Sequence, residues 1–283
     1  MKKPLSPLDL PIPKNQTALM QHLQLLVGRE EHRYWCGGTV PIEKLEAFVY
    51  KMAERYPITR NARGRVYDRK RGIAVVHFIV FPVKNGIAWW LLSSTGKGGL
   101  ADPAMPDFHV SHDAMETAHH IEFEDYVLLY AHKPAGRQKP GRPADVRRGL
   151  STWTWKIRSS TLTELKAGIE REARLLAYGD DGLHGRRPWG LRGLLAYQRQ
   201  RPLFSGVRNQ VIELHRFARD TWEQRRPVWK KKYPEHTSRY GENAGALMPL
   251  QTVMQQHLPT MSRIKIFGSD PTTIQHLCPA AMR

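Results

Sequence analysis

The sequence predicts an α+β fold, in which a sheet domain is followed by a basic, mainly α-helical region. An almost uninterrupted β-type run covers residues 73–81, and a second covers residues 87–92 after an Asn85-Gly86 turn. Apolar residues recur at helical spacing in several segments between residues 161 and 226. With 41% hydrophobic residues among 283, the chain can bury a sizeable core.

The order of elements in the first half suggests a particular sheet topology. Residues 34–39 resemble a short strand, and residues 42–56 a helix whose apolar face includes Leu45, Val49 and Met52. The two β-type runs follow, then a short helix near residues 111–118 and a β-type segment over residues 121–130. Strand, helix, strand, strand, helix, strand is the βαββαβ order of ferredoxin-like domains, the scaffold also used by RNA-recognition motifs. We therefore expect residues 1–132 to form a ferredoxin-like domain, with a proline-rich N-terminal arm and a basic loop at residues 60–71.

The second half reads as a linker, a helical region and a tail. Residues 133–150 are rich in proline, glycine and basic residues, which is typical of a linker or long loop. Residues 151–240 predict a strand at 152–158 and helices at 161–178, 191–200 and 206–226. The last helix has its apolar residues on one side, the apolar seam, and most of its arginines on its other sides. The seam consists of Val207, Val211, Leu214, Ala218 and Trp222. Residues 241–283 are expected to form an irregular tail.

The net charge points to a polyanionic partner. Lysine and arginine number 44 against 26 acidic residues, which gives a formal charge of +18 and a pI near 10.1. Residues 133–239 hold 25 basic and 10 acidic residues, so this third of the chain carries most of the excess. Residues 60–71 hold six basic residues and one acid. Nucleic acid phosphates, membrane surfaces or acidic proteins can neutralise such charge.

Other sequence features narrow the class of protein. No stretch approaches the roughly 18 apolar residues of a spanning helix, so we expect no membrane partner. The two cysteines, Cys36 and Cys278, do not suggest a disulfide framework, which is consistent with a cytoplasmic location.

We therefore predict a nucleic-acid-binding protein that holds a structured RNA, or duplex DNA, through its arginine-rich helical region. It is expected to work within a ribonucleoprotein or other nucleoprotein complex, with further protein subunits as partners. Tryptophans interleaved with the basic residues are expected mainly in the core, although exposed ones could stack on unpaired bases. The predicted binding residues are Arg60, Arg63, Arg65, Arg69, Lys70, Arg71, Arg142, Arg147, Arg148, Arg186, Arg187, Arg208, Arg216, Arg219, Arg225, Arg226, Lys230, Lys231 and Lys232.

One segment resembles an RNA-recognition signature. Residues 71–78, Arg-Gly-Ile-Ala-Val-Val-His-Phe, are similar to the RNP1 pattern of RNA-recognition motifs. Ile73 and Val75 replace the two aromatic residues that would stack bases, so an ordinary buried strand is the expected alternative.

A metal-independent endoribonuclease is the alternative function. A ferredoxin-like domain with a basic helical extension is similar in architecture to the CRISPR repeat-processing endoribonucleases, although no motif secures the resemblance. Those enzymes cut beside a repeat hairpin with histidine, tyrosine, lysine or arginine. His77 and Tyr130 are the candidate catalytic residues that follow from it.

A DNA-nicking replication or mobilisation protein of a mobile element is a second alternative. Tyr130-Ala131-His132-Lys133 satisfies the Tyr-x-x-Lys pattern of rolling-circle nicking enzymes. His77-Phe78-Ile79 lacks the second histidine of their metal-binding strand.

Histidines near residue 112 raise the question of a metal. His112, Glu116, His119 and His120 would share one side of a helix and could hold a divalent ion. The HExxH arrangement is absent, and Glu-x-x-His occurs once where a di-iron bundle needs it twice. We expect polar loop histidines rather than a metal site, and no cofactor.

Overall fold

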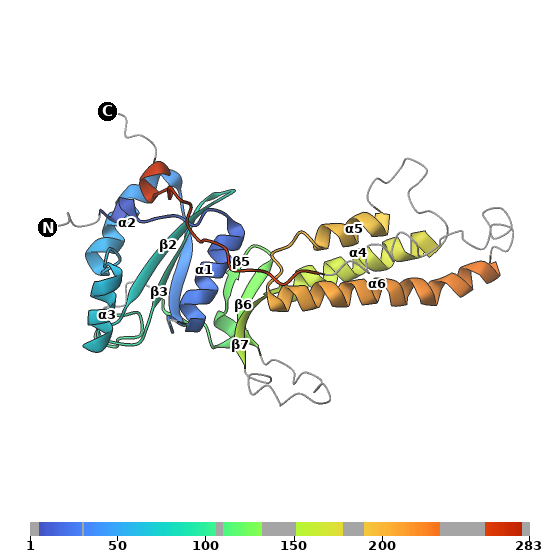
Figure 1. Cartoon of the computed structure of the whole chain (residues 1–283), viewed down its shortest axis with the longest axis horizontal. Coiled ribbons are helices and arrows are strands. Elements are labelled where there is room, and N and C mark those ends of the chain that lie inside the picture. Colours follow the sequence, from blue (N-terminus) through green and yellow to red (C-terminus); the bar gives the residue numbers. More distant parts are fainter. Residues whose placement is uncertain are drawn as a thin grey trace. The chain divides into compact units, whose positions relative to one another are not determined.

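The computed structural model describes residues 6–29, 31–105, 110–131, 151–177, 190–232 and 258–278 (Figure 1). For residues 174–177, 192, 225–230 and 232 it describes the backbone alone. The chain divides into two compact units. Unit 1 comprises Met1–Ile121, Leu128–Trp153 and Arg263–Arg283, and unit 2 comprises Glu122–Val127 and Thr154–Ser262.

Helices and antiparallel sheets make the fold α+β, as the sequence predicts. In chain order the described elements are η1 (Pro7–Asp9), α1 (Gln16–Arg29), β1 (Tyr34–Val40), η2 (Ile42–Lys44), α2 (Leu45–Arg55), α3 (Ala62–Lys70), β2 (Val76–Val83), β3 (Gly86–Ser93), β4 (His112–Asp113), η3 (Thr117–His119), β5 (Ile121–Phe123), β6 (Tyr126–Ala131), β7 (Thr152–Ile157), α4 (Ser159–Ala177), α5 (Gly190–Gln198), α6 (Ser205–Lys232) and η4 (Ile274–His276).

The first sheet has the strand order β2-β3-β1-β4, and each neighbouring pair is antiparallel. The helix expected near residues 111–118 does not form. His112 and Asp113 instead pair with Trp35 and Tyr34 of β1, and the short 3-10 turn η3 follows. The structure therefore does not establish the ferredoxin-like arrangement.

The β-type segment at residues 121–130 also differs from the prediction. It breaks at Glu124, whose φ of 49° lies in the left-handed region, into the two strands β5 and β6. These strands join β7 in a separate three-stranded sheet of order β5-β6-β7. The segment is therefore not the last strand of the first sheet.

The predicted hairpin between the two β-type runs is confirmed. β2 and β3 pair antiparallel from Val76 opposite Ser93 to Val83 opposite Gly86. Gly86 has a φ of 132°, and a Cβ atom there would lie 2.8 Å from the Val40 carbonyl oxygen. Only glycine fits both constraints, which is why the Asn-Gly sequence marks this turn.

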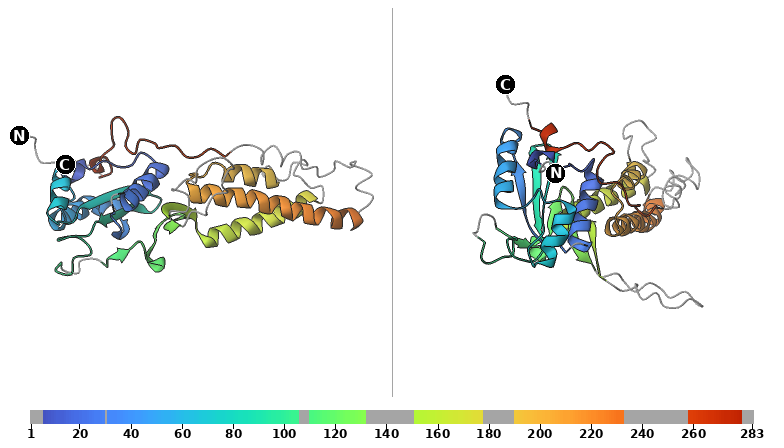
Figure 2. Two further views of the ribbon diagram at one scale, coloured as in Figure 1. Left: turned by 60° about the horizontal axis from the view of Figure 1, so that its bottom comes forward. Right: turned by 60° about the vertical axis from the view of Figure 1, so that its left-hand side comes forward.

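Apolar residues on both faces of the β2–β3 hairpin are buried, as expected for strands covered on both sides. On one face, Phe78 and Leu91 pack with the buried stripe of α2, Leu45, Val49 and Met52. Figure 2 shows α1 and α2 on opposite sides of this sheet. The helical spacing that predicted α2 thus corresponds to its contact with the sheet.

The apolar seam predicted for the last helix is confirmed. All five of its residues are buried, with Trp222 the most accessible at 3%. Leu214, Ala218 and Trp222 of α6 pack against Ile169 of α4 and Leu195 of α5, so three helices share one core in unit 2. Within the described residues, no helix combines the length and apolar character needed to cross a membrane.

Part of the expected C-terminal tail packs on unit 1. The amide of Ile12 donates to the Thr272 carbonyl at 2.8 Å, and the amide of Ile274 donates to the Leu10 carbonyl at 3.0 Å. Ile274 is 1% exposed and lies in the same core as α2. The proline-rich N-terminal arm is thus held by residues from the other end of the chain.

Candidate functional site

The basic segment at residues 60–71 is a helix, α3, rather than the loop expected from the sequence. Asn61 is its N-cap, and its side-chain oxygen accepts from the Gly64 amide at 2.7 Å. The helix has no apolar stripe, and its one buried residue is Asp68. Arginine and lysine are good helix formers, so composition allows a helix that hydrophobic periodicity does not reveal.

An ion pair joins Arg60, which precedes α3, to Asp68 within the helix. The Arg60 guanidinium donates through Nε and Nη2 to the two carboxylate oxygens of Asp68, at 2.7 and 2.8 Å. This bidentate pair lowers the pKa of the Asp68 carboxyl. Arg60, one of the six basic residues of the segment, therefore neutralises the segment's single acid.

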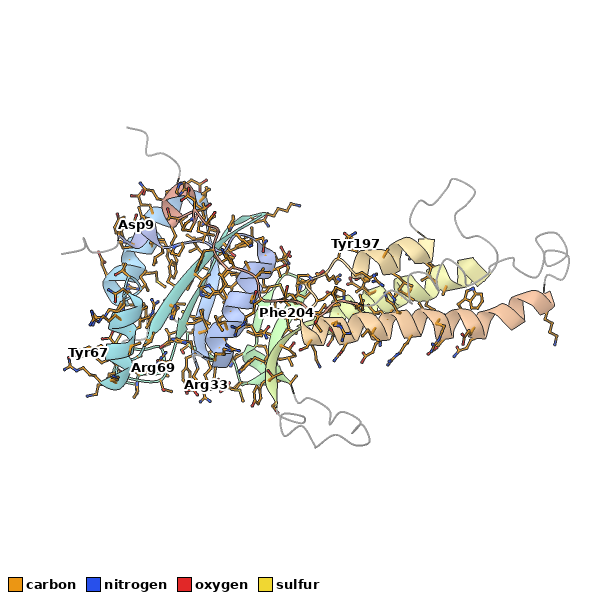
Figure 3. The ribbon with its side chains drawn as sticks, in the orientation of Figure 1. Asp9, Arg33, Tyr67, Arg69, Tyr197 and Phe204 are labelled. Atoms are coloured by element: carbon orange, nitrogen blue, oxygen red, sulfur yellow. The ribbon has the colours of Figure 1, made fainter. Side chains whose placement is uncertain are left out.

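Three cations of the segment share one side of α3 with an exposed aromatic ring. Arg63, Arg69, Lys70 and Arg71 are exposed, and Tyr67 is 55% exposed. Tyr67 points outward from α3, away from the strands (Figure 3). The helical spacing places Arg63, Lys70 and Arg71 four residues before, three after and four after Tyr67, on its side of the helix. We call Arg63, Tyr67, Lys70 and Arg71 the α3 basic face.

Three histidines from distant parts of unit 1 gather near α3. His22 lies on α1, His32 precedes β1, and His77 lies on β2. The rings of His32 and His77 meet edge to face, with centroids 4.7 Å apart. Arg65 of α3 acts electrostatically on His22 and His77, and Arg69 acts on His77. Sequence reasoning selected His77 alone, because nothing local links residues 22, 32 and 77.

The surroundings of His22 and His77 keep these two rings neutral. Burial, and then the charge of Arg65, lowers the pKa of His22 to about 4. Burial is also the main cause that lowers the pKa of His77 to about 2, followed by the electrostatic effects of His32, Arg65, His22 and Arg69. Because the conjugate acid of His77 is so strong, the neutral ring is a poor base and cannot act as an acid near neutral pH. A catalytic role for His77 stays a prediction.

The histidine cluster makes the stability of unit 1 sensitive to acid. Each folded-state pKa is lower than the unfolded value of about 6.5, so the unfolded chain binds more protons below that pH. Folding stability is therefore lost as the pH falls through 6.5, and the loss continues toward the folded pKa values. For His22 and His77 together we expect a decrease of roughly 3 kcal/mol between pH 7 and pH 5, after allowing for their partial exposure.

Hydrogen exchange of the β2 and β3 amides, followed at pH 7, 6 and 5 after correction for intrinsic rates, measures this loss for unit 1 alone. The variant His22→Phe removes one titrating ring and should lose about half as much stability over the same range. An opening free energy that stays constant from pH 7 to pH 5 would contradict the prediction.

The histidines near residue 112 make close contacts with one another and with Glu116. His112 and His119 have ring centroids 4.5 Å apart, and His119 Nδ1 lies 2.8 Å from Glu116 Oε2. The Trp35 indole donates to the His119 carbonyl at 2.9 Å. His120 is partly buried beside them. Across the described part of the chain, no group of three or more histidine, cysteine or acidic residues could hold a metal ion.

Tyr130 lies on strand β6 and is 47% exposed. Its ring contacts that of Trp153, with centroids 5.5 Å apart. His132 and Lys133 of the Tyr-x-x-Lys pattern lie outside the described residues. A role of Tyr130 as a nucleophile therefore stays a prediction.

The RNP1-like segment is divided between two elements. Arg71 ends α3, and Gly72 has a φ of 70°. Strand β2 begins only at Val76, and Val75 is buried. The segment therefore does not form the continuous exposed strand on which an RNA-recognition motif stacks bases.

Several arginines of unit 2 are paired with the protein's own carboxylates. Arg158 contacts Glu122 at 3.3 Å, and Arg201 contacts Asp125 at 3.3 Å with only 10% of its side chain exposed. Arg219 contacts Asp220 at 3.0 Å. Arg208 donates to the carbonyl of Leu258 at 3.1 Å. These arginines serve the fold as well as the surface.

Charge along the described helices of unit 2 is nearly balanced until the end of α6. From Ser205 to Gln224 there are three arginines, of which Arg216 and Arg219 are exposed, and three acidic residues. The last eight residues of α6 then contain the five basic residues Arg225, Arg226, Lys230, Lys231 and Lys232. The predicted residues Arg142, Arg147, Arg148, Arg186 and Arg187 lie outside the described residues.

The tryptophans of the basic region are core residues wherever the structure describes their side chains. Trp153, Trp155 and Trp222 are 8%, 0% and 3% exposed. They are therefore not available to stack on bases. Tyr67 on α3 is an exposed aromatic residue in a group of cations, and sequence reasoning did not select it.

Comparisons with protein-family models, with curated proteins and with solved structures found no match for this chain.

Proposed function

We propose that the protein binds a structured nucleic acid, RNA or duplex DNA, and that the α3 basic face contacts its phosphate backbone. The observation that carries the proposal is the charge of the segment from Arg60 to Arg71, which has six basic residues and one acid. Because Asp68 is buried and paired with Arg60, the exposed charged side chains of α3 are all cationic. Phosphates neutralise such a surface and release counterions as they bind.

The residues exposed on α3 favour a nucleic acid over a membrane surface or an acidic protein as the partner. A helix that lies on a membrane needs a broad apolar face, whereas the exposed large apolar residues of α3 are Val66 and Tyr67. Arginine predominates among its cations, and the planar guanidinium suits bidentate contact with phosphate oxygens.

A ferredoxin-like sheet is the scaffold that we propose beneath this face. The antiparallel order β2-β3-β1-β4 supports it, because a βαββαβ chain places its hairpin beside the first strand. Against it, no helix lies between β3 and β4 among the described residues.

The end of α6 offers a second cationic segment, with five basic residues in its last eight. Cations at a helix C-terminus also complement the helix dipole. We propose that this segment adds phosphate contacts, as the arginine-rich helical region was expected to do.

Ultraviolet crosslinking tests which segment touches the ligand. An end-labelled RNA hairpin is crosslinked to the full chain, and the protein is then cleaved with cyanogen bromide. Cleavage after Met52 and Met105 releases residues 53–105, which contain α3, whereas residues 116–248 form a separate fragment. We expect label in the 53–105 fragment, with or without label in 116–248. Label confined to 116–248, or no crosslink at all, would contradict the assignment to α3.

A further inference from the structure

The exposed ring of Tyr67 has no evident role in the fold. It is 55% exposed, and its neighbour Val66 is 52% exposed. Its side chain contacts Arg71: the guanidinium carbon lies 5.4 Å from the ring centroid, and Arg71 Nη1 lies 3.4 Å from the phenolic oxygen. A large aromatic surface in water, on a helix held in place by other residues, is available to a ligand.

The cations around Tyr67 identify the chemistry of that ligand. Arg71 contacts the ring, Arg63 and Lys70 are exposed at helical spacing on the same side of α3, and the one acid of the segment, Asp68, is paired with Arg60. A protein partner with an apolar contact would need an acidic rim to match this face. A nucleotide matches both the ring and the cations, because its base presents an aromatic face and its phosphate carries a negative charge.

We infer that Tyr67, together with the Arg71 guanidinium, is a stacking platform for an unpaired base, and that the α3 basic face therefore takes single-stranded segments such as the loop of a hairpin. The inference rests on the proposed nucleic-acid binding and sharpens its substrate class. Aromatic rings and arginine planes stack on bases of any sequence, and cations beside them track the backbone. The bases of a perfect duplex are stacked on one another, so Tyr67 adds nothing to duplex binding.

Two substitutions of Tyr67 and one matched control test the inference. Tyr67→Ala removes the ring, Tyr67→Phe keeps the ring without the hydroxyl, and Tyr50→Ala removes a tyrosine that is 43% exposed on α2. Each full-length variant is titrated by fluorescence anisotropy with a labelled 12-nucleotide oligouridylate and with a blunt 12-base-pair duplex. Thermal unfolding of each variant confirms that the fold is intact.

We expect Tyr67→Ala to weaken binding of the oligouridylate about 10-fold, because stacking on one aromatic side chain is worth this much or more. Tyr67→Phe and Tyr50→Ala should stay within about 2-fold of the unaltered protein, and the duplex should not distinguish the variants. The inference is overturned if Tyr67→Ala binds the oligouridylate normally, or if Tyr67→Phe loses as much as Tyr67→Ala. If the unaltered protein binds neither oligonucleotide, the proposed function itself fails.

Discussion

Replacement of Arg63, Lys70 and Arg71 by glutamate is expected to weaken binding of an RNA hairpin by about 100-fold or more at roughly 100 mM salt. The three side chains are exposed on one side of α3, and the variant replaces three attractive phosphate contacts with three repulsive ones. Fluorescence anisotropy with a labelled hairpin measures the loss. Circular dichroism and thermal unfolding establish that the variant retains its fold.

A control with the same change in net charge separates a local contact from a general attraction. Lys44, Lys51 and Lys84 are exposed on other elements of unit 1, and their replacement by glutamate also lowers the charge by six. The affinity of this control variant for the hairpin should fall by less than about 5-fold, because only long-range attraction is reduced. Equal losses in the two variants would mean that α3 is not a specific contact surface.

The substitution Gly206→Ala is expected to destabilise unit 2 by about 3 kcal/mol. Gly206 lies in the first turn of α6, and its amide donates to Thr154 Oγ1 at 3.0 Å. A Cβ atom there would lie 2.4 Å from the Trp155 carbonyl oxygen and 2.8 Å from Lys156 Cγ. Because one obstacle is backbone, α6 can accept the methyl group only by moving away from β7.

Gly168→Ala is the matched substitution in the same unit. Gly168 lies within α4, where a Cβ atom would have its nearest contact at 3.8 Å, an ordinary van der Waals distance. This variant should gain about 0.5–1 kcal/mol, because alanine forms helices better than glycine. Hydrogen exchange of the α4 and α6 amides measures both changes. Equal stability of the two variants would show that β7 and α6 do not approach as described.

Elements whose signal is local could be predicted from the sequence. The hairpin between β2 and β3 follows from two β-type runs joined by Asn85-Gly86. The helix α6 follows from an apolar seam at regular spacing, which packs on α4 and α5. In both cases the residues that form the element also determine how it is buried.

Elements that depend on distant partners could not be predicted. β4 is two residues long and exists because His112 and Asp113 pair with β1, more than seventy positions earlier in the chain. The C-terminal segment lacks any periodicity, yet its backbone pairs with the N-terminal arm through Ile12 and Thr272. In α3, a buried acid paired with Arg60 replaces the apolar stripe on which recognition of a helix depends.

The candidate site was only partly accessible to sequence reasoning. The basic residues of 60–71 and His77 can be identified from the sequence. However, the excess of basic over acidic residues is larger after residue 133, and the binding site was therefore predicted mainly in unit 2. There, carboxylates of unit 2 pair with Arg158, Arg201 and Arg219. The exposure of Tyr67 and the clustering of His77 with His22 and His32 arise from tertiary structure alone.

The salt dependence of binding tests most directly whether α3 meets phosphates. The logarithm of affinity for a single-stranded oligonucleotide is measured against the logarithm of salt concentration for the unaltered protein and for the variant Arg63→Gln, Lys70→Gln, Arg71→Gln. Each lost phosphate contact reduces the slope by about 0.7, so the variant should have a slope shallower by about 2. Identical slopes for the two proteins would contradict the assignment of α3 as the nucleic-acid contact.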